Sequence, residues 1–245
     1  MRKWIAIGLS ALMISSLTGC TVYLKDSAND VAYVKEMAVK QTDKESSAFK
    51  ELDLTIQMGV GDLKIGGDSE NLVEGKFEYS DKGWEPIVEE RELATTKIVK
   101  VTQPSVKISR LNNTVYNWNF KIAEQIPTDL KLESGVGRSK LDLRKTAIEK
   151  LDIEMGVGEV ELNLDQNYAK DVDVSIQGGV GNLEIILPKD MGVKAKVQGG
   201  LKTLKANGFI INEETLTNSA YKEGEPCIEL DIQAGIGNIS LKMAD

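Results

Sequence analysis

Hydrophobic and polar residues alternate along most of this chain, and the alternation changes phase at regular places. In the first clear example, LDLTIQMGVGDLKI, apolar residues occupy every second position from Leu52 to Val60. A period of two is typical of a strand with one buried face. The apolar series resumes at Leu63, three residues after Val60, where a straight strand would turn it to solvent. The segment therefore predicts two short strands joined by a bend or bulge.

The same pattern occurs six times. The other copies are LKLESGVGRSKLDL from Leu130, LDIEMGVGEVELNL from Leu151, VDVSIQGGVGNLEI from Val172, VKAKVQGGLKTLKA from Val193 and IELDIQAGIGNISL from Ile228. One bent strand pair cannot bury its apolar face alone, so the copies are expected to stack on one another. The sequence thus predicts an all-β fold, a repetitive β-solenoid-like stack of bent strand pairs.

Paired glycines flank the central aliphatic residue of five copies. At such a corner the backbone kinks and neighbouring copies approach closely, and glycine takes positive φ there without steric cost. We expect the central valine or isoleucine to be the core residue of each bend. Lys202 replaces the second glycine of the fifth copy, which predicts a less sharp corner. The glycines expected to be structural are Gly59, Gly61, Gly135, Gly137, Gly156, Gly158, Gly179, Gly181, Gly235 and Gly237.

The repeat domain is predicted over 49–245, with one insertion near its start. The motif is absent over 66–127, where short strand-like runs, among them Val115–Ile122, predict an antiparallel meander inserted after the first repeat. In the loop at 80–84 we expect Trp84 to fold back as a lid rather than contact a partner.

The remaining copies stack over 128–245, and most of their central residues are 21–23 positions apart, a length that suits one solenoid rung. The excursion Lys205–Pro226 interrupts them. Such an insertion lies on a binding face or caps the last rung, and we favour the cap.

The N-terminus is typical of a secretion signal. Arg2 and Lys3 precede an apolar stretch, Trp4–Leu17, that is short for a transmembrane helix. The stretch ends in Leu17-Thr18-Gly19-Cys20, which resembles the lipobox of bacterial lipoproteins. The resemblance implies cleavage of a signal peptide at 1–19 and acylation of Cys20. The alternative is an ordinary signal peptide with a chance cysteine. Residues 20–48 are then interpreted as the lipidated N-terminus and a tether.

The predicted anchor fixes the expected location of the domain. Two or more acyl chains hold a protein stably at a membrane, so we expect it on the extracytoplasmic side of a bacterial envelope. Thr21 after Cys20 favours the outer membrane in a two-membrane cell, and in a one-membrane cell the outer face of the plasma membrane.

The net charge of the chain limits the classes of partner that it is expected to bind. The chain has a formal net charge of −8, and cleavage after residue 19 removes two positive charges, so −8 becomes −10. An acidic body of this kind argues against nucleic acid and against electrostatic docking on anionic lipid.

Composition excludes several kinds of catalytic site. There is no histidine, which removes Ser-His-Asp and Cys-His catalysis and histidine-based zinc sites. The Gly-Val-Gly corners lead into strands and lack the Lys-Ser/Thr of a phosphate loop. If Cys20 carries lipid, Cys227 is the remaining thiol; it is either a redox or dimerisation handle or, as we expect, a thiol covered by a neighbouring loop. We predict no enzymatic activity, cofactor or metal.

Outward carboxylates raise one further hypothesis. If the rungs stack in register, these carboxylates share a face, and a divalent cation or a basic partner would relieve their repulsion. Lys131, Lys194 and Lys196 interrupt the stripe, however, which favours a solvated face of mixed charge. The carboxylates concerned are Asp53, Asp152, Glu154, Asp173, Glu229 and Asp231.

Four short stretches resemble the bacterial toast-rack domain family, which is related to the C-terminal domains of cell-wall-active-antibiotic response proteins and to adhesin-type repeat domains. They are Asn117-Trp118-Asn119-Phe120, Ile126-Pro127-Thr128-Asp129-Leu130, Gly135-Val136-Gly137 and Leu141-Asp142-Leu143. The resemblance implies an all-β repeat domain at the cell envelope, without catalytic residues to carry over. Some relatives act in envelope-stress signalling behind transmembrane helices; the lipobox here argues against direct control of a membrane kinase.

Three functions follow as hypotheses. The favoured one is a non-enzymatic, membrane-anchored surface lipoprotein that binds an envelope or signalling protein, in the envelope-stress response. The first alternative is a surface adhesin or glycan-binding module, for which the sequence offers few exposed aromatics. The second is a hydrolase or lyase on a β-helix scaffold, which would need charged groups converging on one rung.

Overall fold

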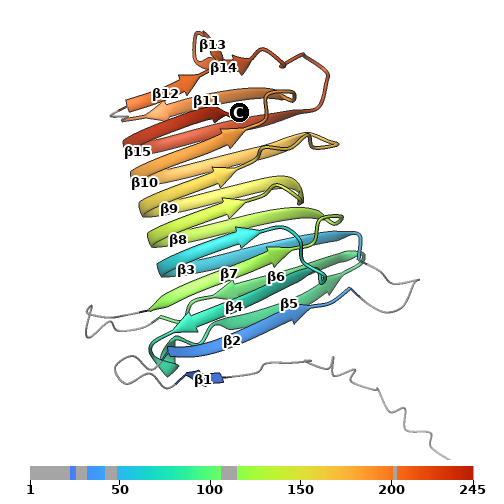
Figure 1. The fold of residues 1–245 in the computed structure, drawn as a ribbon, viewed down its shortest axis with the longest axis vertical. Coiled ribbons are helices and arrows are strands. Elements are labelled where there is room, and N and C mark those ends of the chain that lie inside the picture. The colour runs from blue at the N-terminus through green and yellow to red at the C-terminus, as the bar shows by residue number, and fades with distance from the viewer. Residues whose placement is uncertain (1–22, 26–31, 42–48, 106–114, 201–202, 245) are drawn as a thin grey trace, which may run out of the picture.

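Long strands, each bent in the middle, stack into a column in a computed structural model that describes residues 23–25, 32–41, 49–105, 115–200 and 203–244 (Figure 1). The column is one sheet of 15 strands. Its central rungs are β3 (Glu51–Gly66), β8 (Pro127–Asp142), β9 (Ala147–Asn163), β10 (Val172–Leu187) and β15 (Cys227–Met243). The predicted all-β, solenoid-like stack is confirmed.

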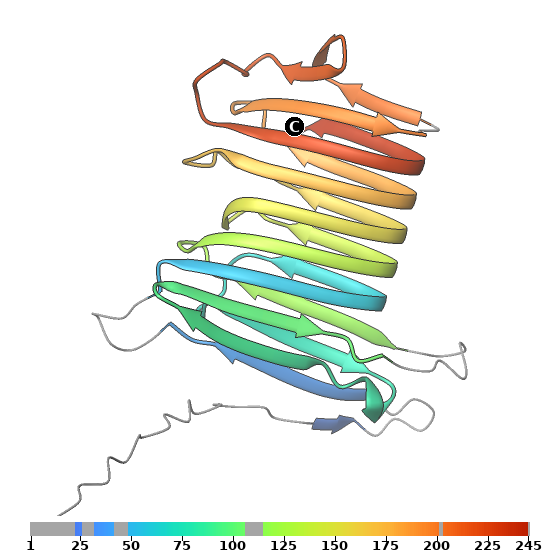
Figure 2. The same cartoon turned by 180° about the vertical axis from the view of Figure 1, so that it is seen from behind.

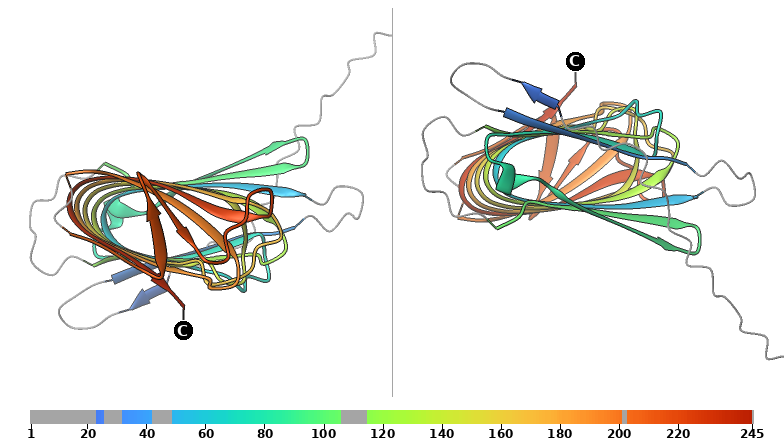
Figure 3. Two further views of the ribbon diagram at one scale, coloured as in Figure 1. Left: turned by 90° about the horizontal axis from the view of Figure 1, so that it is seen from above. Right: turned by 90° about the horizontal axis from the view of Figure 1, so that it is seen from below.

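The five central rungs are parallel and share one register. Val60 pairs with Val136, which pairs with Val157, then Val180, then Ile236. Seen along the column, the rungs superpose as flattened loops (Figure 3). Each rung has a limb before the corner and a limb after it, and their inward side chains meet between them to form the core.

The corner reverses the inward series as the sequence predicts, but it turns the central residue outward. Met58 is 2% exposed and Leu63 is 1% exposed, whereas Val60 between them is 40% exposed. Its counterparts are also exposed: Val136 50%, Val157 48%, Val180 48% and Ile236 62%. The prediction that these are core residues was therefore wrong. Four residues cross the tight corner on its convex side, where no interior is left for a side chain.

The glycine pairs meet two different requirements. The second glycine has a positive φ, +153° at Gly137, and a Cβ there would fall on the carbonyl oxygen of Gly61 in the preceding rung. The first glycine is required only because the preceding rung lies too close for a side chain. A Cβ on Gly135 would meet the carbonyl oxygen of Gly59. The same close approach recurs up the stack, which supports the structural role predicted for these glycines.

The stacking order departs from the chain order at the C-terminal end. The fifth copy forms β11 (Gly192–Gly199) and β12 (Thr203–Asn207), and both pair in parallel with β15, which lies between them and β10. The sixth copy is thus enclosed between the fourth and the fifth. Such a position protects the last strand from being an exposed edge. Lys202 and its predicted corner lie outside the described residues.

The excursion after the fifth copy forms a cap, as predicted. β13 (Phe209–Asn212) and β14 (Thr215–Asn218) make a hairpin, and β14 pairs antiparallel with β11 (Figure 1). The buried Asn218 amide accepts from Val193 N–H at 2.9 Å and donates to the Met191 carbonyl at 2.8 Å. Beneath this end Cys227 is 6% exposed, so the prediction of a covered thiol is confirmed.

The insertion at 66–127 is only partly a meander. β4 (Val73–Tyr79) pairs antiparallel with β7 (Tyr116–Ile122), and β5 (Ile87–Leu93) with β6 (Thr96–Thr102). However, β6 and β7 also lie parallel to the first and second limbs of β3, so together they take the place of a rung.

Trp84 folds back into this N-terminal end, as expected. It closes the short 3-10 helix η1 (Lys82–Trp84) and is 7% exposed. The Tyr116 hydroxyl donates to its carbonyl at 2.8 Å, and the two rings pack edge to face.

The folded domain begins earlier than predicted. β2 (Ala32–Val39) pairs antiparallel with β4 and buries Met37 and Val39, and β1 (Tyr23–Lys25) pairs with β2. These residues belong to the sheet and not to a tether. Lys35 occupies the same inward series as Met37 and Val39, where its ammonium group pairs with Glu85 at 2.9 Å. A charged residue in the inward series hides the alternation that would have predicted this strand.

Two adjacent glycines of one corner are expected to respond oppositely to an added methyl group. Gly178→Ala meets open space and should raise the free energy of unfolding by about 0.5–1 kcal/mol, because it restricts the unfolded chain. Gly179→Ala meets the Gly156 carbonyl and should lower it by about 1–3 kcal/mol. Urea unfolding followed by circular dichroism measures both, and equal effects would contradict the corner geometry.

Cys227 is expected to be inert in the folded protein. Burial raises the pKa of its thiol, and the nearby Glu229 and Asp171 act in the same direction, so little thiolate forms at neutral pH. In a Cys20→Ser variant, maleimide labelling of Cys227 should be slow before unfolding in urea and complete afterwards. Labelling at the same rate in both states would show that the thiol is accessible.

Candidate interaction surface at the corners

The strands of the stack bend along one edge of the column (Figure 2), and a ridge of exposed aliphatic side chains runs along that edge. It consists of the outward central residues, aligned by the shared register. With parallel strands about 4.8 Å apart, five rungs give a ridge about 20 Å long. Contiguous exposed apolar surface of this kind marks an interaction site more often than scattered aliphatic residues do. The ridge residues are Val60, Val136, Val157, Val180 and Ile236.

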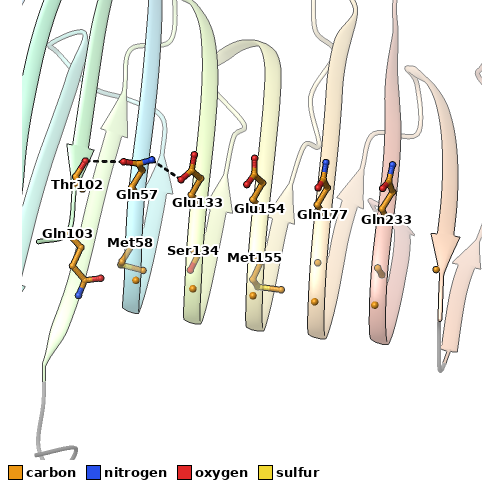
Figure 4. Close-up of a pocket in the computed structure, with 18 of the residues that line it drawn as sticks. Gln57, Met58, Thr102, Gln103, Glu133, Ser134, Glu154, Met155, Gln177 and Gln233 are labelled. Atoms are coloured by element: carbon orange, nitrogen blue, oxygen red, sulfur yellow. Dashed lines mark hydrogen bonds between the residues drawn. The ribbon is translucent and has the colours of Figure 1, made fainter. Parts of the chain in front are cut away.

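A trough of about 840 Å³ lies beside the ridge on the first-limb side. The first glycine of each corner, such as Gly135 and Gly179, lines it and adds no side chain, so backbone forms much of the floor. One polar side chain from each rung forms the wall, and Figure 4 shows most of them in a row. The wall residues are Thr102, Gln57, Glu133, Glu154, Gln177, Gln233 and Gln198.

The N-terminal half of the wall is charged and already hydrogen-bonded. Gln57 accepts from the Thr102 hydroxyl at 3.2 Å and donates to Glu133 at 2.7 Å. Lys131 lies 2.9 Å from Glu133 and 3.1 Å from Glu154. The hydrogen bond from Lys131 lowers the pKa of Glu133, which is therefore a carboxylate at neutral pH.

The C-terminal half is uncharged and open. In the part of the chain that the structure describes, the side-chain amides of Gln177, Gln198 and Gln233 make no hydrogen bond. Across the ridge, Asn238 donates to Asn182 at 2.9 Å. This half can therefore donate and accept hydrogen bonds toward a ligand without bringing a charge.

Gln103 closes the trough at its N-terminal end (Figure 4). Its side-chain amide accepts from Val60 N–H at 2.8 Å and donates to the Val60 carbonyl at 3.3 Å. A side chain thus satisfies both backbone groups of Val60 on this side of the β3 corner. Sequence reasoning did not identify Gln103, because its role depends on the strand beside it.

The outward carboxylates of the first limb share a face, as the sequence predicts, and lysines are interspersed among them. Lys150 lies 3.1 Å from Asp152, and Lys194 lies 3.1 Å from Glu229. Within the described ranges, no group of three or more His, Cys, Asp or Glu side chains is placed to hold a metal ion. The face of mixed charge is the better description.

The predicted anchor cannot be placed in this geometry. The signal peptide at 1–19 and Cys20 lie outside the described residues. Among the residues that are described, no helix is both long and apolar enough to span a membrane.

Two family models match the chain. The model described as the N-terminal domain of toast_rack matches residues 30–186, and the one described as the C-terminal domain of the cell wall-active antibiotics response protein LiaF matches residues 136–241. No curated protein matches the chain significantly.

The solved structures that resemble this chain include a near relative and more distant ones. A protein of Clostridium sporogenes, described as a "putative cell adhesion protein", is 36% identical, with a TM-score of 0.81 over 86% of this chain and 99% of its own. An adhesin candidate from Bacteroides fragilis is 12% identical (TM-score 0.26, 86% and 96% covered). One from Parabacteroides distasonis is 11% identical (TM-score 0.29, 86% and 98% covered).

The matched residues include every central rung of the column, and the first model alone spans more than half of the chain. The bent strands, the glycine corners and the shared register account for that match in physical terms. The chain belongs to the toast-rack family.

Proposed function

We propose that this chain is a non-enzymatic surface lipoprotein of the bacterial envelope that binds a protein partner through the corner ridge and its trough, in the response to envelope stress. The observation that carries the proposal is the ridge. Five aliphatic side chains, 40–62% exposed, stand in line beside a trough whose glycine floor leaves room for a partner's side chains.

The surface suits binding better than catalysis. Its carboxylates Glu133 and Glu154 belong to adjacent rungs, and Lys131 neutralises both at 2.9 and 3.1 Å, so neither is a free acid or base. A periodic ridge with a polar wall instead offers the same contact several times over, which suits a protein surface more than a small substrate. These features favour binding over the hydrolase or lyase alternative.

The stress-response part of the proposal draws on the match of residues 136–241 to a domain described by its response to cell-wall-active antibiotics. These residues include the ridge from Val136 to Ile236. A surface adhesin is the second candidate, and the description of the 36% identical Clostridium relative favours it. Against a glycan-binding adhesin, none of the described residues that line the trough is aromatic.

The anchor is tested through Cys20. We expect the native chain to fractionate with membranes and Cys20→Ser to appear mainly in the soluble fraction, because the acyl chains supply the binding energy and the acidic body does not. Fractionation followed by immunoblotting measures the shift. Cys227→Ser is the matched control and should remain with the membranes. An unchanged distribution of Cys20→Ser would contradict lipid anchoring at this residue.

The partner is tested by crosslinking in cells, with and without a cell-wall antibiotic, followed by mass spectrometry. We expect a specific protein to be captured by the native chain and lost from the double variant Val136→Lys and Val157→Lys, because two ammonium groups would be buried against it. Leu93→Lys, at a position 67% exposed and away from the ridge, is the control. Capture of wall polymer alone, or of nothing, would reject this function and favour the adhesin.

A further inference from the structure

Among the described residues, no charged side chain directly flanks the ridge in the C-terminal half of the corner surface. Val180 and Ile236 form the ridge there, and six polar but uncharged residues flank it, whereas 28% of the whole chain is charged and its net charge is −8. Copies of so acidic a protein repel one another over most of their surfaces, but not here. The flanking residues are Gln177, Gln198 and Gln233 on the first limb, and Asn182, Thr203 and Asn238 on the second.

Amides are also self-complementary. Each carries a donor and an acceptor, so one amide can pair with another of its own kind, which carboxylates and ammonium groups cannot do. The three glutamine amides of this half have no partner among the described residues. A surface that is neutral, partly apolar and rich in free amides therefore fits a copy of itself.

We propose that the partner of the corner surface is a second copy of this chain, docked side by side and parallel, with the two-fold axis along the column. The inference rests on the proposed function, because it names the protein that occupies the same ridge and trough. Each ridge enters the other copy's trough, where the glycine floor leaves space for Val180 and its neighbours. An isologous contact of this kind is self-limiting and closes as a dimer.

The symmetry follows from the shape of the corner. The ridge lies to one side of its trough, so only a two-fold axis parallel to the column brings both ridges into both troughs. The same rotation sets the trough wall of one copy against the second-limb row of the other. Gln177 then faces Asn182 of the second copy, and Gln233 faces Asn238 of the second copy.

The charged half of the surface is compatible with this arrangement. Glu133 of one copy faces Arg138 of the other, and this contact occurs twice by symmetry. Glu154 faces Glu159 of the second copy, but Lys131 lies 3.1 Å from Glu154 and Arg138 lies 3.3 Å from Glu159 within each chain. The parallel arrangement also leaves β1 and β2 of both copies at the same end, as anchorage in one membrane requires (Figure 1).

The pair is expected to be weak in solution and favoured at a membrane. A contact about 20 Å long would need about 40 Å of width to reach the ~800 Å² per partner of a standard interface. Confinement of both copies to one surface raises their effective concentration without any new contact.

Cysteine crosslinking of the full, membrane-bound chain tests the arrangement. In a Cys227→Ala background, Val60→Cys and Ile236→Cys mark the two ends of the ridge, and a short bifunctional maleimide is the probe. Each variant alone should form crosslinked dimers. Adding Val180→Lys should reduce the crosslinked yield about tenfold, as expected when a charge is buried at the centre of a small interface. Ile210→Lys, 64% exposed on the cap, is the control and should leave the yield unchanged.

Two results would overturn the inference. Crosslinking only in a mixture of the Val60→Cys and Ile236→Cys chains would show an antiparallel pair, and no crosslinking above the Cys227→Ala background would show that the ridges do not meet. If, in that case, the native chain is crosslinked in cells to a different protein and the ridge variants lose that crosslink, the proposed function stands. Only the second copy is then rejected as the partner.

Discussion

The distance between neighbouring corners is the constraint on which the rest of the structure depends. Parallel strands lie about 4.8 Å apart, and here they keep that spacing through a tight bend. A Cβ at Gly137 or Gly158 would fall on a carbonyl oxygen of the rung before it, so the second corner position of these central rungs leaves no room for a side chain. The stack closes because glycine removes that obstacle and accepts the positive φ.

The same constraint produces the candidate surface. With glycine on either side, the central residue of a corner is the one place where a side chain can stand, and it stands outward because the inside of the bend is full. The glycines leave a trough beside it, and the last outward residue of the first limb, such as Glu133, forms the wall. Fold and surface thus share one origin, and a substitution at a corner glycine would disturb both.

Much of the fold could be predicted from the sequence, because period, parity and spacing are local properties. The bend, the shared register and the cap over Lys205–Pro226 follow from them. The outward direction of the Val60 side chain could not be predicted. An aliphatic residue at the end of an inward series looks the same in the sequence whether its side chain turns in or out. The position of β15 between β10 and β11 could not be predicted either. All copies have compatible strand edges, so the sequence does not show which two strands pair with β15. β2 and Gln103 were missed because their roles depend on distant strands.

Specificity in this fold is separable from stability. Backbone ladders and inward residues hold the column together, whereas the two rows beside the ridge contribute little to the core. They can therefore change from the charged set around Glu133 and Arg138 to the amides around Gln177 and Asn182 while the same backbone continues beneath them. A single column can thus present charged and neutral contacts at different heights. Which partner binds is then decided by a few outward side chains per rung and not by the fold.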